Sequence, residues 1–214
     1  MRPFLINIDP SNTDADGIAD ALPTGSAWAF GTDAEWLANG SGDSLAHRLI
    51  ITTVADEPGG NAPILTLTGT DADGIAQTED ITLPNATTVE STKYWLTVTS
   101  GVTQADTVGV FDIGWVDEIM TQTLPLNYRN YEAATFSVNV TGTIDYSVQE
   151  TLDEIHTQAN PSEDACWFDI TALAAKTADL MAVGTVHASA SRLVVNSYTN
   201  TAEIKFTTMQ NESI

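Results

Sequence analysis

The sequence contains a single cysteine, Cys166, and this scarcity limits how the fold can be held together. One thiol cannot close a disulfide within the chain, so packing and hydrogen bonds must stabilise the structure. We therefore expect the chain to fold in a reducing cytoplasm. Cys166 stands next to Trp167 and Phe168, and this apolar setting favours a packed, inert thiol over an activated thiolate.

Positive charge is scarce as well. The chain has 7 Lys and Arg residues against 29 Asp and Glu residues, which gives a formal net charge of -22. Phosphate backbones and anionic lipids attract clustered cations, so the sequence argues against partners that are nucleic acids or membrane surfaces. Copies of so acidic a chain repel one another at low salt, and an interface between them must be apolar or bridged by cations. The cations lie far apart, at Arg2, Arg48, Lys93, Arg129, Lys176, Arg192 and Lys205.

Long apolar runs are absent too. The run at Phe4–Ile6 is too short for a signal peptide, and no stretch is long enough to cross a bilayer as a helix. We expect the chain to be made in the cytoplasm and to stay there unless it leaves as part of a particle.

Recognisable catalytic motifs are missing. The histidines available as a base are His47, His156 and His187, and none of them lies in a known nucleophile–base pattern. Acidic pairs are so abundant that some will lie at a catalytic distance by chance. The sequence also lacks a phosphate loop and a dinucleotide fingerprint. We therefore expect no enzymatic activity, no catalytic residues, no cofactor and no metal.

Two Asp-rich segments resemble the opening of a calcium loop. They are Asp14–Gly17 and Asp71–Gly74, each reading Asp-Ala-Asp-Gly within a longer repeated stretch. The closing bidentate Glu of a calcium loop is missing, since Glu79 is only loosely positioned for that role. A plain hairpin turn with Gly74 at positive φ is the favoured interpretation of the second segment, and the first segment either uses the same turn or matches it by chance.

Short runs rich in Thr, Val and Ile dominate the rest of the chain and predict a mainly β fold. In Ile64–Thr68 and Tyr94–Thr99, apolar residues alternate with Thr wholly or in part, which is typical of a sheet with one buried face. The expected strands are 47–54, 64–70, 75–83, 94–99, 107–113, 134–140, 144–151, 167–170, 192–197 and 202–208, with a loop at 58–61.

The pattern predicts two antiparallel β-sandwich or barrel-like domains preceded by an extended N-terminal arm. The arm covers residues 1–44, the first β domain residues 45–120, and the second residues 121–214, with the boundary in the Pro- and Asn-containing stretch 120–131. One short Ala-rich helix is expected within Thr171–Met181, where Thr171 can cap it.

The arm contains the aromatic residues Trp28, Phe30 and Trp36, which would be poorly used in solvent. We therefore predict that these residues form an interface, either on a neighbouring subunit or on the chain's own domain. A locally tucked loop is the alternative.

Two segments resemble the small, Thr-rich, all-β virion structural proteins of tailed double-stranded DNA phages. They are Leu65–Ser100, which includes Thr66-Leu67-Thr68-Gly69-Thr70 and Tyr94-Trp95-Leu96-Thr97-Val98, and Tyr146–Asp153 together with Trp167-Phe168 and Arg192–Ser197. This resemblance covers roughly residues 60 to 208 and implies a structural role without an active site.

Within that class, the resemblance and the acidity imply a capsid decoration (cement) protein on the outside of the head, away from the packaged DNA. The expected partners are its own copies, as a homotrimer, and the major capsid protein or other virion proteins. A tail tube, adaptor or fibre-base subunit is one alternative, and a carbohydrate-binding β-sandwich module is another.

Overall fold

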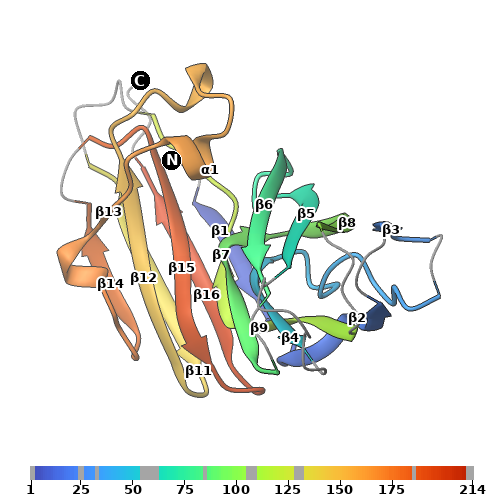
Figure 1. Cartoon of the computed structure of the whole chain (residues 1–214). Coiled ribbons are helices and arrows are strands. Elements are labelled where there is room, and N and C mark those ends of the chain that lie inside the picture. The colour runs from blue at the N-terminus through green and yellow to red at the C-terminus, as the bar shows by residue number, and fades with distance from the viewer. Residues whose placement is uncertain are drawn as a thin grey trace. The chain divides into compact units, whose positions relative to one another are not determined.

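The computed structural model describes residues 3–23, 27–31, 34–53, 63–83, 86–104, 110–127, 133–184 and 187–210. Within these ranges the chain is built almost entirely from antiparallel strands, so the predicted mainly β class is confirmed (Figure 1). The strands divide into two compact units. Unit 1 contains residues 1–12 and 117–214, and unit 2 contains residues 13–116.

Unit 2 consists of two layers of strands. One sheet has the order β3-β8-β5-β6, formed by β3 (Ala27–Ala29), β8 (Thr97–Gln104), β5 (Ile64–Thr70) and β6 (Ala76–Thr82). The other contains the first part of β9 (Val110–Met120), β4 (Ala46–Thr53) and β7 (Thr88–Trp95), with β2 (Asp14–Pro23) paired to β9. Leu65, Leu67, Ile51 and Phe111 are fully buried between them. The alternation of Thr with Leu in β5 thus buries one face of the strand, as its sequence predicts.

Unit 1 also has two sheets. The first has the order β1-β16-β11-β14, formed by β1 (Phe4–Ile8), β16 (Glu203–Met209), β11 (Thr135–Thr141) and β14 (Leu180–Val183). The second contains β13 (Phe168–Asp169), β12 (Ile144–Thr151) and β15 (Ala190–Tyr198), with β10 (Leu124–Pro125) and the end of β9 beside β15. Phe136 and Phe206 stack with ring centroids 6.2 Å apart in the core. Tyr146 and Val148 point inward as predicted, and both are fully buried.

In the described part of unit 1, three helical turns accompany the strands: η1 (Ile155–Thr157), α1 (Pro161–Asp164) and η2 (Thr171–Leu173). The prediction of a helix within 171–181 is wrong. Only the single turn η2 forms there, and the stretch ends in strand β14 (Leu180–Val183). Ala175 adopts a positive φ of 49°, which no α-helix allows. Lys176 forms a backbone bridge with Tyr146 instead, so strand pairing overrides the helix propensity of the alanines.

The predicted arm is not a separate element. β1 pairs along its whole length with β16, while β2 and β3 add strands to the two sheets of unit 2.

The division between the units falls inside β9, before the Pro- and Asn-containing stretch that the sequence suggests as a boundary. The predicted loop at 58–61 lies outside the described residues. The predicted strands 64–70 and 144–151 match β5 and β12 residue for residue.

Two glycines let β2 cross closely over β9 in unit 2. A Cβ on Gly114 would lie 1.9 Å from the carbonyl oxygen of Asp14, and a Cβ on Gly17 would lie 2.5 Å from the ring of Trp115. Only glycine fits at a backbone approach of this kind. The Asp-Ala-Asp-Gly segment at Asp14–Gly17 is therefore part of a strand and does not form the turn that its counterpart at Asp71–Gly74 forms.

We predict that Gly114→Ala destabilises unit 2 by about 3 kcal/mol, because the new methyl group meets backbone that cannot rotate away. Gly101→Ala is the matched control. Its Cβ would meet the terminal methyl groups of Leu67 and Leu65 at 3.2 and 3.4 Å, and those side chains can shift. Urea denaturation measures both. Equal losses for the two variants would show that the close approach of β2 to β9 is not a constraint.

Tyr146 provides a second test. Its hydroxyl donates a hydrogen bond of 2.9 Å to the carbonyl of Ala178, and burial, followed by the charge of Asp179, raises the pKa of Tyr146 to about 12. This pKa is higher in the folded than in the unfolded chain. The neutral Tyr146 therefore stabilises the folded state fully at pH values below the ordinary tyrosine pKa near 10. It is lost as the pH rises from about 10 to 12. We predict that Tyr146→Phe flattens the fall of unfolding free energy over this range, measured by denaturation at each pH. Identical slopes for wild type and variant would contradict the assignment.

Candidate interaction surface

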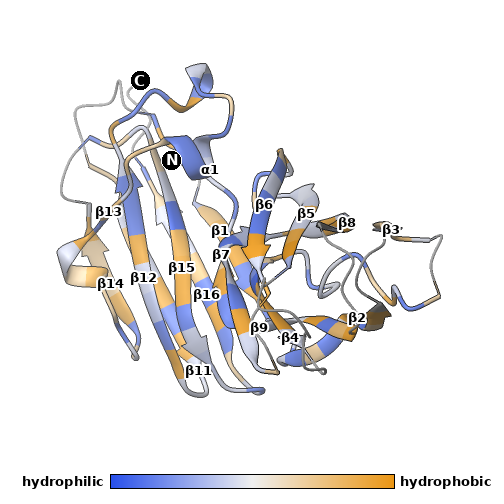
Figure 2. Ribbon diagram, viewed as in Figure 1, coloured by the Kyte–Doolittle hydropathy of each residue, from blue (hydrophilic) through white to orange (hydrophobic). Residues whose placement is uncertain are grey.

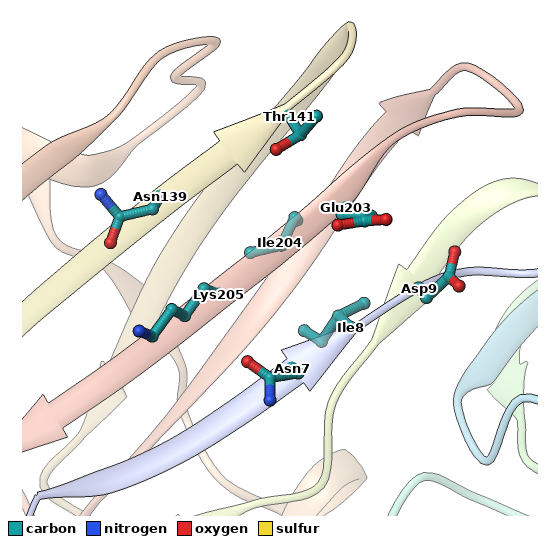
Figure 3. A pocket seen from close by; sticks show the side chains of 8 residues that line it. All are labelled: Asn7, Ile8, Asp9, Asn139, Thr141, Glu203, Ile204 and Lys205. Carbon is teal, nitrogen blue, oxygen red and sulfur yellow. The ribbon is translucent and has the colours of Figure 1, made fainter.

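The outward face of the sheet β1-β16-β11-β14 carries two kinds of surface. At one end of the sheet, Asn7, Lys205 and Asn139 lie directly opposite one another across β1, β16 and β11. Glu203 and Thr141 form the next pair on the same face. These strands line a depression of about 500 Å³, and Figure 3 shows the side chains in it; the lining residues are Asn7, Ile8, Asp9, Asn139, Thr141, Glu203, Ile204 and Lys205.

The other end of the same face is apolar. Leu5, Thr207, Ser137 and Met181 form one row across the four strands, and Met209, Thr135 and Val183 form the next. The large side chains in these rows are exposed, with Met181 70% and Val183 60% accessible. Figure 2 shows β14 as a hydrophobic segment at the margin of this sheet. The face therefore combines exposed apolar side chains with amide and charged groups, which suits contact with a macromolecule.

The three aromatic residues predicted as an interface do not share one environment. Trp28 and Trp36 are each 5% exposed and belong to the core of unit 2, where Trp28 contacts the ring of Phe111 edge-on at 5.3 Å. Phe30 is 45% exposed. Of the three, Phe30 is thus the side chain that a partner can contact. The two tryptophans pack on the strands of their own unit, which was one of the two placements expected for them.

His47 lies in a buried polar network. Its Nε2 is 2.8 Å from Asp43 Oδ2, and the other carboxylate oxygen accepts hydrogen bonds from Ser41 Oγ and the Leu45 amide at 2.7 and 2.9 Å. Its Nδ1 faces the carbonyl of Val116 at 3.4 Å. The hydroxyl of Ser41 contacts the carboxylate and not the imidazole, so this trio lacks the nucleophile–base contact of a hydrolase. The network instead fixes the segment that enters β4.

The other sequence candidates for chemistry are scattered. His156 and His187 are both exposed, and Cys166 is exposed as well, so the prediction of a packed thiol is wrong. The backbone leaves α1 at this point, and the Cys166 amide donates to Asp153 Oδ2 at 2.6 Å. Trp167 beside it is covered by the Arg192 guanidinium, 4.3 Å from the ring centroid. Among the residues that the structure describes, no three His, Cys, Asp or Glu side chains are arranged to hold a metal ion.

The carboxylates of the second Asp-rich segment have structural partners. Asp71 Oδ1 accepts hydrogen bonds from the amides of Asp73 and Ile75 at 3.0 and 2.8 Å, and Gly74 has a φ of 75°. Glu79 is turned toward β7, where it accepts a hydrogen bond from the Thr92 amide at 2.6 Å and another from Trp95 Nε1 at 3.3 Å. This is a hairpin turn stabilised by its own aspartate.

The first Asp-rich segment is exposed on β2. The pKa of Asp16 is raised, mainly by a side-chain hydrogen bond with Asp14 and then by desolvation and by the nearby charges of Asp14 and Asp20. A neighbouring carboxyl group thus disfavours the charged form of Asp16. This pair belongs to a strand, so the two Asp-Ala-Asp-Gly segments have different structural roles.

No protein-family model matches the chain, and no curated protein matches it either. Across the described ranges, none of the helices has the length and apolar character needed to cross a membrane.

We predict that His47 is a structural residue. His47→Ala removes one partner of the buried Asp43 carboxylate and should lower the free energy of unfolding by about 3 kcal/mol. His156→Ala, at an exposed position, serves as the control and should change it by less than about 0.5 kcal/mol. Urea denaturation gives both values. A His47→Ala protein as stable as the control would assign the network no role in the fold.

Proposed function

We propose that this chain is a non-enzymatic structural subunit of a tailed double-stranded DNA phage virion. Within that class, its role is that of a capsid decoration protein that binds the major capsid protein and its own copies. The observation that supports this proposal best is the apolar end of the outward face in unit 1. There, Leu5, Met181, Val183 and Met209 are exposed on a four-stranded sheet, a position suited to contact with other subunits.

The distribution of exposed apolar side chains adds support. Monomeric soluble proteins rarely expose large apolar side chains in a contiguous group, and such groups mark interaction surfaces. In unit 1 the group lies on and beside one sheet, while the alternation of hydroxyl and apolar residues supplies a stable β scaffold behind it.

The charge of the chain favours a position outside the head. A formal net charge of -22 is repelled by packaged DNA, whose phosphates are also negative. A decoration protein on the outer surface avoids this repulsion. A subunit of the tail tube, adaptor or fibre base remains the alternative within the same class.

The carbohydrate-binding alternative receives less support from the geometry. Sugar-binding modules stack exposed aromatic rings on the sugar, yet Trp28, Trp36, Trp95 and Trp115 are all buried, and Trp167 is partly covered by Arg192. The described tyrosines, Tyr94, Tyr146 and Tyr198, are not exposed either. The exposed aromatic rings in the described ranges are those of Phe4, Phe30 and Phe168.

We predict that the purified protein co-sediments with expanded heads that lack it, at a fixed number of copies per head. Deletion of residues 1–40 would remove β1, β2 and β3, so a point substitution is the better probe of the N-terminal region. Phe30→Ser should reduce occupancy if Phe30 contacts the head, and Leu152→Ser, also at an exposed position, is the control.

The outcomes separate the possibilities. Absence from heads together with labelling of tails by an antibody to the chain would move the protein to the tail. Absence from every part of the particle would contradict the proposal. Unchanged occupancy of the Phe30→Ser protein would exclude Phe30 from the interface.

A further inference from the structure

The sheet β1-β16-β11-β14 has two open edges of the same unusual character. Among the described residues, β1 pairs only with β16, and β14 pairs only with β11. Each edge strand therefore has one side of its backbone that no other described strand occupies. The sequences of the two strands are Phe-Leu-Ile-Asn-Ile and Leu-Met-Ala-Val.

Edge strands in soluble proteins usually carry features that prevent pairing with other chains, such as lysine, proline or a bulge. Neither β1 nor β14 has a charged residue or a proline, and neither has a shift in its pairing register. Their side chains are exposed all the same: Phe4 is 45%, Leu5 47% and Met181 70% accessible. Two unprotected apolar edges on one sheet indicate that both are covered in the assembled protein.

The charge of the chain indicates what covers them. Most approaches of two copies bring carboxylates together, because the chain carries 29 acidic residues. The two edges are neutral, so they are places where copies can meet without this repulsion. We propose that copies of this chain associate head-to-tail, with β14 of one copy pairing with β1 of the next to continue the sheet. This rests on the part of the proposed function in which copies bind one another.

The strand directions fit such a pairing. Neighbours in the sheet are all antiparallel and the sheet has four strands, so β1 and β14 run in opposite directions. A neighbouring copy that continues the sheet in the same orientation therefore presents β1 antiparallel to β14. The faces match as well. Leu5 and Met181 lie on the outward face, whereas Ile6 and Leu180 lie on the face that buries Phe206 and Val138.

Electrostatics selects the register of the pairing. Side chains alternate between the two faces along a strand, and Leu5 and Asn7 are the residues of β1 on the outward face. If the outward faces of two copies are to be continuous, Met181 must lie opposite one of these two residues of the next copy. The second arrangement places Asp179 opposite Asp9, and like charges directly opposite are destabilising. The first places Asp179 opposite the Asn7 amide and groups Met181 with Leu5. The inferred register therefore pairs Met181 with Leu5 of the next copy.

A head-to-tail contact covers both edges with one type of interface. A symmetric pairing of β14 with β14 of a second copy would leave β1 uncovered. Repeated head-to-tail contacts generate a closed ring, or a filament if the rotation between copies does not close. Closure as a trimer agrees with the homotrimer expected for a decoration protein.

Two substitutions test the polarity of the contact. Leu5→Lys and Met181→Lys each place a charge on one edge at an exposed position, and we expect each variant to be monomeric by sedimentation at concentrations where the wild type is oligomeric. An equimolar mixture should then form a heterodimer, because each variant retains the edge that the other lacks. Leu152→Lys, which is exposed but outside both edges, should assemble like the wild type.

Disulfide trapping tests the register. In a Cys166→Ser background, Leu5→Cys and Met181→Cys proteins should form covalent heterodimers when mixed and oxidised, because directly opposite residues of paired strands lie within disulfide distance. Neither single variant should dimerise efficiently alone. Equal trapping of Met181→Cys with itself would overturn the head-to-tail polarity in favour of a symmetric pair.

These experiments test the contact between copies separately from the proposed location in a virion. A wild-type chain that stays monomeric at every concentration tested, or lysine variants that assemble normally, would overturn the inferred contact even if the protein co-sediments with heads. Conversely, the expected heterodimer together with absence from virions would retain the contact and reject the proposed function.

Discussion

The pairing of β1 with β16 is the constraint on which the organisation of the chain depends. It joins Phe4–Ile8 to residues that follow about two hundred positions later, and it assigns the start of the chain to unit 1 although residues 13–116 form unit 2. Ile8, opposite Ile204, is buried by this pairing, and the Tyr198 hydroxyl donates a hydrogen bond to the carbonyl of Ser11 just beyond it. Non-local pairing of this kind slows folding in general, because a long loop must close before the contact stabilises the chain.

Local sequence pattern predicts the strands well where pairing is also local. The segment 64–70 alternates clearly and is followed by a turn and by its antiparallel partner β6. The segment 144–151 also alternates, although its partner β15 comes much later in the chain. The pattern fails for residues 1–44, because β1 and β2 find partners far along the chain and β2 passes close to β9 at Gly17 and Gly114. It fails again for 171–181, where alanine favours a helix but the bridge of Lys176 to Tyr146 and the edge position of β14 decide the structure.

The sequence predicts only part of the candidate interaction surface. Aromatic residues in an irregular stretch suggest an interface, yet burial of Trp28 and Trp36 depends on which strands surround them, and one sequence does not supply that information. The apolar end of the outward face is formed by residues from four strands that are widely separated in the chain. Only the pairing register brings Leu5, Met181 and Val183 onto one face, so composition alone could not have identified it.

Acidity and the proposed self-association are compatible because the carboxylates and the neutral strand edges occupy different parts of the molecule. Coulomb repulsion between exposed carboxylates weakens within about a Debye length in salt, whereas apolar contact and backbone hydrogen bonding act only where the chains touch. In the proposed assembly, the neutral edges would restrict contact to one arrangement, because any misaligned approach of two copies brings like charges together. The surface charge that opposes association elsewhere would then restrict the proposed contact to the edges of a single sheet.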